Sequence, residues 1–206
     1  MEPSDKLRNT APAEISDTAG GLRVTPLGLD GLRLVELKVR GDARGFFVER
    51  FHEAAFEAHG LPTTFVQDNH SRSAPGVLRG LHYQNEPEQG KLVGVVRGRV
   101  WDVVVDIRPE SVTFGQHVTT ELSDMNGRLL WIPPRFAHGF CVLGEEPADI
   151  VYKVDAPYCP ATEGGLFWGD EDLAIRWPIK SPVVSERDRR LPGFAEFRAA
   201  LPTQSH

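Results

Sequence analysis

One histidine, His82, lies in the stretch LRGLHYQ, which has the composition of a β-strand. An imidazole titrates near neutral pH, so it can take up a proton and return it at physiological pH. Alternation along a strand predicts Arg79 on one face and His82 on the other, beside Gly80, whose small size leaves room on that face. Two interpretations of His82 follow: a general base in a pocket, or a structural histidine with satisfied hydrogen bonds.

A metal site is the next chemistry that this stretch could carry. Such a site needs three or four ligands that converge from neighbouring strands. Gln84 stands where a second ligand would project beside His82, and the other candidates are Glu86, Glu88 and His138. A ligand set of His82, His138 and one glutamate stays conceivable, but the tight pair of histidines is absent and the sequence favours a site without metal.

Two further stretches are rich in polar side chains. Arg44 and Glu49 lie in GDARGFFVERF, and Gln67, Asp68 and Asn69 lie in FVQDNHS. Amide and carboxylate groups clustered in this way can bind the edge of a nucleobase or the hydroxyls of a sugar. Taken alone, however, FVQDNHS favours a polar turn.

Near the C-terminus, local patterns indicate structure more than chemistry. Tyr152 and Lys153 end the strand-like run ADIVYKV, and Tyr152 could be a core residue whose hydroxyl reaches water. Arg187 and Asp188 lie in SERDRRLP, which taken alone is typical of a solvated charge run that caps the last helix. Neither stretch points to a reaction by itself.

Short strands are the elements that would position these residues. Helix is indicated only in EAAFEAHG, closed by Gly60, and in PGFAEFRAAL, opened by Pro192. Turns are indicated at Arg97–Gly98 and in DMNGR, which contains an Asn–Gly pair. The strand-like runs are RLVELKV, KLVGVVRGRVWDVVVDI, GQHVTTELS, LLWIPP, FCVLG and ADIVYKV. Many short strands separated by turns predict an all-β jelly roll.

Length and composition bound the protein further. The chain has 206 residues, which suits one domain over residues 21–206 after a polar tail, residues 1–20, that we expect to be disordered. A net charge of −6 without a basic stripe predicts no binding to nucleic acid. The two cysteines, Cys141 and Cys159, indicate free thiols in a reducing compartment. No signal peptide and no run of about 18 apolar residues is found, which predicts a cytoplasmic protein without membrane contact.

The chain resembles the deoxythymidine-diphosphate (dTDP)-4-dehydrorhamnose 3,5-epimerases from about residue 23 to residue 190. FVQDNHS joined to GVLRGLHYQ is the most specific part of the resemblance. Matching stretches, in family order, are GDARGFFVERF, FVQDNHSRSAPGVLRGLHYQ, GKLVGVVRGRVWDVVVDIR, TFGQHV, LLWIPPRFAHGF, VYKVDAPYCPATEGG and SERD. The resemblance implies a cupin-type jelly roll with a few short peripheral helices, which works as a homodimer and needs neither cofactor nor metal.

The resemblance also implies a role for individual residues. His82 is similar to the family's general base, Asp188 to the partner that orients the imidazole, and Tyr152 to the acid that returns a proton on the opposite face. Lys91 is similar to the cation that stabilises the enolate oxygen. Contacts to the nucleotide or sugar are implied for Arg44, Glu49, Gln67, Asp68, Asn69, Arg79, Lys91, His138, Glu163 and Arg187.

The implied reaction is epimerisation of a dTDP-4-keto-6-deoxyhexose at C3 and C5, in deoxysugar or rhamnose biosynthesis. Both hydrogens are α to the ketone, so the substrate itself accepts the electrons. Three departures are Arg187, where lysine is usual, Trp101, where phenylalanine is usual, and Pro157, where tyrosine often stands. The alternatives are an antibiotic-sugar mono-epimerase that inverts C3 or C5 only, a metal-dependent cupin oxidoreductase, and a non-catalytic sugar-nucleotide binding protein.

Overall fold

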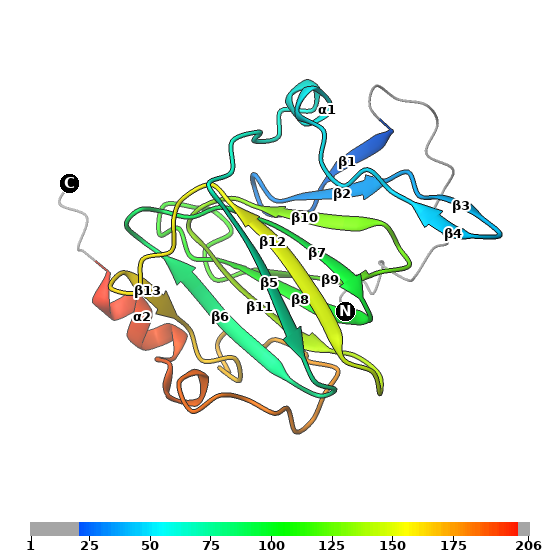
Figure 1. Cartoon of the computed structure of the whole chain (residues 1–206). Helices are drawn as coiled ribbons and strands as arrows, with labels where there is room; N and C mark the ends of the chain where they lie inside the picture. The colour runs from blue at the N-terminus through cyan, green and yellow to red at the C-terminus, as the bar shows by residue number, and fades with distance from the viewer. Residues whose placement is uncertain (1–20, 202–206) are drawn as a thin grey trace, which may run out of the picture.

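Two antiparallel β-sheets pack face to face in the computed structural model, which describes residues 21–201 (Figure 1). The predicted tail, residues 1–20, lies outside the described residues. The six-stranded sheet has the order β1 (Leu22–Pro26), β2 (Arg33–Leu37), β10 (Arg128–Ile132), β7 (Lys91–Arg97), β12 (Ala148–Val154), β5 (Gln67–Ser73). The five-stranded sheet has the order β13 (Glu163–Gly165), β6 (Leu78–Gln84), β11 (Phe136–Val142), β8 (Arg99–Asp106), β9 (His117–Ser123).

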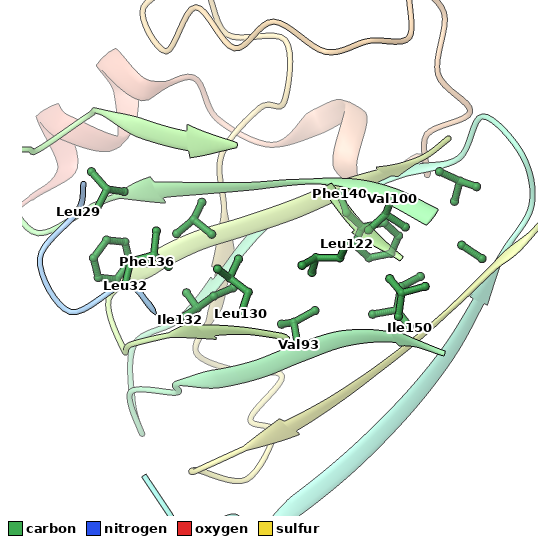
Figure 2. Packing of buried hydrophobic residues seen from close by; sticks show 14 residues of the cluster. Leu29, Leu32, Val93, Val100, Leu122, Leu130, Ile132, Phe136, Phe140 and Ile150 are labelled. Carbon is green, nitrogen blue, oxygen red and sulfur yellow. The ribbon is translucent and has the colours of Figure 1, made fainter. Parts of the chain in front are cut away.

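The core fills the space between the two sheets, as Figure 2 shows. Val93 and Ile150 enter it from the six-stranded sheet, and Val104 and Phe140 enter it from the five-stranded sheet. Each such side chain contributes about 1.5–3 kcal/mol when it leaves water. Because side chains alternate along each strand, the same strands present a second set of residues on their outer faces.

Two short helices cover the outer faces, as the sequence predicted. Helix α1 (Glu53–Ala58) begins after His52, whose side chain accepts a hydrogen bond from the Ala55 N–H, and its Phe56 is buried on the outer face of the six-stranded sheet. Helix α2 (Phe194–Ala200) packs Phe194 and Phe197 on the outer face of the five-stranded sheet. A single 3-10 turn, η1 (Asp188–Arg190), precedes it.

The predicted all-β jelly roll is confirmed, with two local corrections. FVQDNHS, which alone favoured a turn, contributes most of strand β5, an edge strand whose residues alternate between partly buried and exposed. The strand was not predicted because its residues are polar, and an edge strand needs no continuous apolar face. Strand β11 begins at Phe136, four residues before the predicted run FCVLG. The predicted turns at Gly98 and Gly127 are confirmed, and both glycines have positive φ.

The short strands β3 (Arg40–Asp42) and β4 (Gly45–Phe47) form a separate hairpin that extends away from the sandwich (Figure 1). Phe46 and Phe47 on this hairpin are 60% and 63% exposed. Both cysteines are free thiols, Cys141 buried and Cys159 partly exposed, as predicted. None of the helices within residues 21–201 is both long and apolar enough to span a bilayer.

Candidate active site

A pocket of about 540 Å³ opens between the two sheets and the C-terminal segment. Its walls come from β6 and β11 of one sheet, β7 and β12 of the other, and residues 183–188. Eight residues that the sequence predicted for the site line this one pocket: Arg79, His82, Lys91, His138, Tyr152, Glu163, Arg187 and Asp188.

A histidine–aspartate pair lines the pocket. His82 Nε2 donates a hydrogen bond to Oδ1 of Asp188 at 2.8 Å. The second carboxylate oxygen of Asp188 accepts the Gly80 N–H at 3.2 Å. Asp188 is only 3% exposed, so it departs from the solvated charge run expected locally, whose other charged residues are exposed. Burial alone would raise the pKa of Asp188, but the bonds from His82 and Gly80 outweigh it and hold that pKa below its ordinary value.

Strand β6 is irregular where it passes the pocket. Across the β6–β11 ladder, His82 faces His138 and Arg79 faces Phe140, so three steps on β6 oppose two steps on β11. This extra residue breaks the alternation, as a β-bulge does. Arg79 and His82 therefore both line the pocket, and the prediction that they lie on opposite faces was wrong.

Gly80 has a different role from the one expected. A Cβ atom at Gly80 would lie 2.6 Å from the Cα of Gly139 on β11, and its φ is +123°. The glycine is needed for close contact between two backbones and does not leave room for a ligand. The nearby guanidinium of Arg79 is held at the pocket by a 2.9 Å hydrogen bond from Nε to the Ser73 hydroxyl.

Tyr152 approaches the pocket from the sheet opposite His82. It lies on β12 of the six-stranded sheet, whereas His82 lies on β6 of the five-stranded sheet. Burial, together with the nearby Glu163 carboxylate, raises the pKa of the Tyr152 phenol. The phenol is therefore protonated near neutral pH and can donate a proton.

Lys91, the first residue of β7, supplies an ammonium group to the same space. Its Nζ donates to the backbone carbonyl of His82 at 3.4 Å. Burial lowers the pKa of Lys91 to about 8, and the carboxylates of Glu163 and Asp102 oppose part of this decrease. A cation next to His82 can stabilise negative charge that develops on the oxygen of a bound ligand.

The mouth of the pocket carries a second group of charges. Oε2 of Glu163 accepts a hydrogen bond from the Tyr158 hydroxyl at 2.8 Å and lies 2.6 Å from the guanidinium of Arg187. Burial alone would raise the pKa of Glu163, but Tyr158 and Arg187 hold it below its ordinary value. Glu163 and Arg187 thus form an ion pair at the entrance.

Gln67, Asp68 and Asn69 lie on edge strand β5, next to the pocket rather than inside it. Gln67 Nε2 donates to Asn69 at 2.8 Å, and its Oε1 accepts the Tyr158 N–H at 3.1 Å. Asp68 alternates to the other face of β5 and is bonded to Lys153 at 2.8 Å. Gln67 and Asn69 are thus next to the mouth, and Asp68 points away from it.

Arg44 and Glu49 are not brought to the pocket of their own chain. Arg44 lies at the turn of the β3–β4 hairpin and bonds Asp42, with 3.1 Å between Arg44 Nε and Asp42 Oδ2. Glu49 is exposed two residues after the hairpin. Neither lines the pocket that His82 lines.

Sequence reasoning did not select several residues of the site. Ser73 and Tyr158 fix Arg79 and Glu163 through hydrogen bonds, and neither has a distinctive local pattern. A signal did exist for Asp102, which is a charged residue inside the apolar run VWDVVVD. The other pocket residues not selected are Ser71, Val77, Leu78, Gln89, Phe140, Ile150, Val183, Val184 and Ser185.

The conceivable ligand set of His82, His138 and a glutamate does not form a metal cluster in the described chain. Within residues 21–201, no group of three or more His, Cys, Asp or Glu side chains is arranged to hold a metal ion. The two histidines direct their Nε2 atoms to different aspartates, His82 to Asp188 and His138 to Asp102. The pocket thus combines two histidines and the phenol of Tyr152 with three cationic side chains, those of Arg79, Lys91 and Arg187.

A jelly roll with such a pocket has the features of a cupin-like sugar-nucleotide epimerase. The family model of dTDP-4-dehydrorhamnose 3,5-epimerase matches residues 26–196. A dTDP-4-dehydrorhamnose 3,5-epimerase from Pseudomonas aeruginosa is 50% identical over 177 residues, which are 85% of this chain and 97% of the relative. The chain belongs to the dTDP-4-dehydrorhamnose 3,5-epimerase family.

Two solved structures are also similar. A dTDP-6-deoxy-D-glucose-3,5-epimerase from Legionella pneumophila, in complex with dTDP-4-keto-L-rhamnose, superposes with a TM-score of 0.81 at 44% identity and covers 90% of this chain and 100% of its own. A 4-keto-6-deoxy sugar epimerase from the novobiocin biosynthetic gene cluster of Streptomyces spheroides superposes with a TM-score of 0.84 at 38% identity and covers 93% of this chain and 98% of its own.

Proposed function

We propose that this protein epimerises a dTDP-4-keto-6-deoxyhexose at C3 and C5, without a cofactor. One observation carries the proposal: His82 and Tyr152 line a single pocket from opposite sheets. A base on one side of a flat enolate and an acid on the other side invert the carbon that loses and regains a proton. The family membership of the chain supports the same conclusion.

His82 acts as the base through Nδ1, because Nε2 is bonded to Asp188. Removal of the C3 or C5 hydrogen leaves an enolate whose charge falls mainly on the former ketone oxygen. The Lys91 ammonium stabilises that oxygen as its charge develops. Tyr152 then delivers a proton to the opposite face of the carbon, and Asp188 stabilises the charged imidazole of His82 meanwhile.

The nucleotide is bound at the mouth of the pocket in this proposal. Arg79 and Arg187 are placed for the pyrophosphate, since guanidinium forks match phosphate oxygens. Gln67 and Asn69 are placed for the base or the deoxyribose. Binding energy from these remote groups orients the hexose at His82.

We also propose that the active form is a homodimer. The predicted substrate contacts Arg44 and Glu49 lie outside the pocket of their own chain, and the same hairpin exposes Phe46 and Phe47. A second copy that covers these rings would bring Arg44 to the partner's pocket. Light scattering should give twice the chain mass, and the double substitution of Phe46 and Phe47 to serine should give a monomer with reduced activity. A monomer with full activity would contradict the proposal that the active form is a homodimer.

Proton NMR of the reaction in heavy water, with dTDP-4-keto-6-deoxyglucose as substrate, tests the main proposal. Deuterium at both C3 and C5 supports it, and deuterium at one position identifies a mono-epimerase. Binding without any uptake identifies a sugar-nucleotide binding protein. Activity that needs stoichiometric metal and is lost with a chelator identifies a metal-dependent oxidoreductase.

The mono-epimerase is the second candidate because Pro157, which lies next to the pocket, departs from the family pattern. Pro157 stands where tyrosine often stands, and its carbonyl accepts a hydrogen bond from Gln84 Nε2 at 3.0 Å. The same loop carries Tyr158, which lines the pocket, so Pro157 can change how the hexose sits.

The cytoplasmic location, and the single domain over residues 21–206, stay predictions.

A further inference from the structure

Asp102 is an acidic residue in the interior of the jelly roll. It lies on β8 between Val100 and Val104, which both belong to the core between the sheets, and it is 1% exposed. Its Oδ2 lies 2.9 Å from Nε2 of His138, and its Oδ1 is buried without a partner in the described part of the chain. A buried carboxylate with a single hydrogen bond is costly to keep.

A second buried aspartate on the same strand shows what a structural role looks like. Asp106 is 0% exposed and accepts hydrogen bonds from the Arg108 guanidinium and from the hydroxyls of Ser111 and Thr113. Burial opposes ionisation of Asp106, but these bonds lower its pKa to about 2. In contrast, burial raises the pKa of Asp102, and His138 and the charge of Lys91 offset part of this rise. The hydrogen bond of Asp102 therefore offsets little of the free energy that burial of its carboxylate costs.

The pair of Asp102 and His138 matches the pair of Asp188 and His82 in geometry. The two histidines face each other across the β6–β11 ladder, and each directs Nε2 to a buried aspartate. An ionised carboxylate only accepts, so His138 carries its proton on Nε2. Nδ1 of His138 is then the ring nitrogen left for a ligand in the pocket that His138 lines.

Asp102 also acts on Lys91. Its negative charge raises the pKa of Lys91, as does that of Glu163, against the larger lowering by burial. One carboxylate thus influences two groups of the pocket, through a hydrogen bond to His138 and through its charge at Lys91. The other titratable or charged groups that line this pocket are Arg79, His82, Tyr152, Tyr158, Arg187 and Asp188.

We propose that Asp102 is a positioning residue, which holds His138 with Nδ1 toward the hexose. This inference rests on the proposed epimerase function, since it assigns a sugar-binding orientation to His138. The proposal adds Asp102 to the proposed active site as a residue that acts through His138 and does not touch the substrate itself. The orientation of an imidazole is set in this way wherever its second nitrogen bonds a carboxylate.

Asp102→Asn is the test, because asparagine has the same size but no charge and can donate to His138. The variant should lose about 10- to 100-fold in kcat/KM for the 4-keto sugar, with unchanged affinity for dTDP, which has no hexose. The alkaline limb of its pH–rate profile should move to lower pH, since Lys91 loses a charge that raises its pKa. Asp106→Asn is the matched control and should leave that limb unchanged.

Two results would overturn the inference. The first is wild-type kcat/KM and a wild-type pH profile in folded Asp102→Asn. The second comes from the wild-type protein and so does not depend on a variant that folds without Asp102. Long-range proton–nitrogen NMR of the wild-type imidazoles, with the His138 signals assigned by their loss in His138→Gln, should show a proton on Nε2 of His138. An Nε2 without a proton would contradict the proposal. Deuterium uptake by the wild-type enzyme is measured first. If uptake is absent, the epimerase function fails, and the NMR result alone decides the orientation of His138.

Discussion

His82 Nε2 lies 2.8 Å from Oδ1 of Asp188, a residue 106 positions later in the chain. Because this bond uses one ring nitrogen, only Nδ1 of His82 can take a proton from a substrate. Asp188 reaches His82 from η1, the 3-10 turn that precedes α2. The C-terminal segment is thus part of the proposed active site, and α2 anchors it through Phe194 and Phe197.

His82→Asn should abolish deuterium uptake at both C3 and C5. Asparagine cannot act as a base at neutral pH, and loss of a positioned base lowers the rate by a factor of about 10²–10⁴. NMR in heavy water measures the uptake. His70→Asn is the control, because His70 is an exposed residue of β5 outside the pocket. Uptake at the wild-type rate in His82→Asn would show that another group is the base.

Tyr152→Phe should separate exchange from inversion. The ring remains but the proton donor is lost, so uptake of deuterium at a carbon α to the ketone persists while net inversion falls. The measurement is uptake and product configuration in one NMR time course. Tyr83→Phe is the control, since Tyr83 packs against Phe197 outside the pocket. If both quantities stay at wild-type levels in Tyr152→Phe, Tyr152 is not the acid.

The pH–rate profile should have an alkaline limb near the pKa of Lys91, about 8. Lys91 carries its charge below that pH and loses it above, so stabilisation of the enolate falls as the pH rises. Lys91→Arg keeps a charge well above pH 8 and should move the limb to higher pH, with a lower maximal rate because a guanidinium has a different shape. A limb that stays near pH 8 in Lys91→Arg would assign it to another group.

Asp106 should stabilise the fold in a pH-dependent way. Burial opposes its ionisation, but hydrogen bonds from Arg108, Ser111 and Thr113 lower its folded-state pKa to about 2, below the value in an unfolded chain. Its contribution is therefore complete above about pH 4 and is lost as the pH falls through about 2. Asp106→Asn should lower the free energy of unfolding by about 2 kcal/mol at pH 7. Urea denaturation of both proteins at several pH values measures this, and equal stability at pH 7 would contradict it.

Gly80→Ala should damage both the fold and the site. The new methyl would lie 2.6 Å from Gly139 Cα, in a backbone with φ of +123°. The expected loss in the free energy of unfolding exceeds that of an ordinary alanine at positive φ, which is about 1–3 kcal/mol. Gly76→Ala is the matched control, because Gly76 also has positive φ but no atom within 4 Å of the new methyl. Equal thermal unfolding of the two variants would rule out the close backbone contact.

Alternation and turn chemistry were enough to predict most of the fold. ADIVYKV became β12 with the predicted bounds, and Gly98 and Gly127 made the predicted turns. Helices α1 and α2 lie where Gly60 and Pro192 indicated. These features are local, because a strand or a cap depends on residues a few positions apart. Strand β5 was not predicted because its polar residues have no apolar period.

The sequence by itself determined the all-β class and, through family resemblance, eight of the residues that line the pocket. Only the tertiary structure decided that Asp188 is buried although its local run is charged, that a bulge turns Arg79 to the same pocket as His82, and that Arg44 stays outside it. The physical reason is that burial and strand register depend on residues distant in the chain. SERDRRLP has the local pattern of a solvated run. Its aspartate, Asp188, is nevertheless buried, because it bonds His82, a residue 106 positions earlier in the chain.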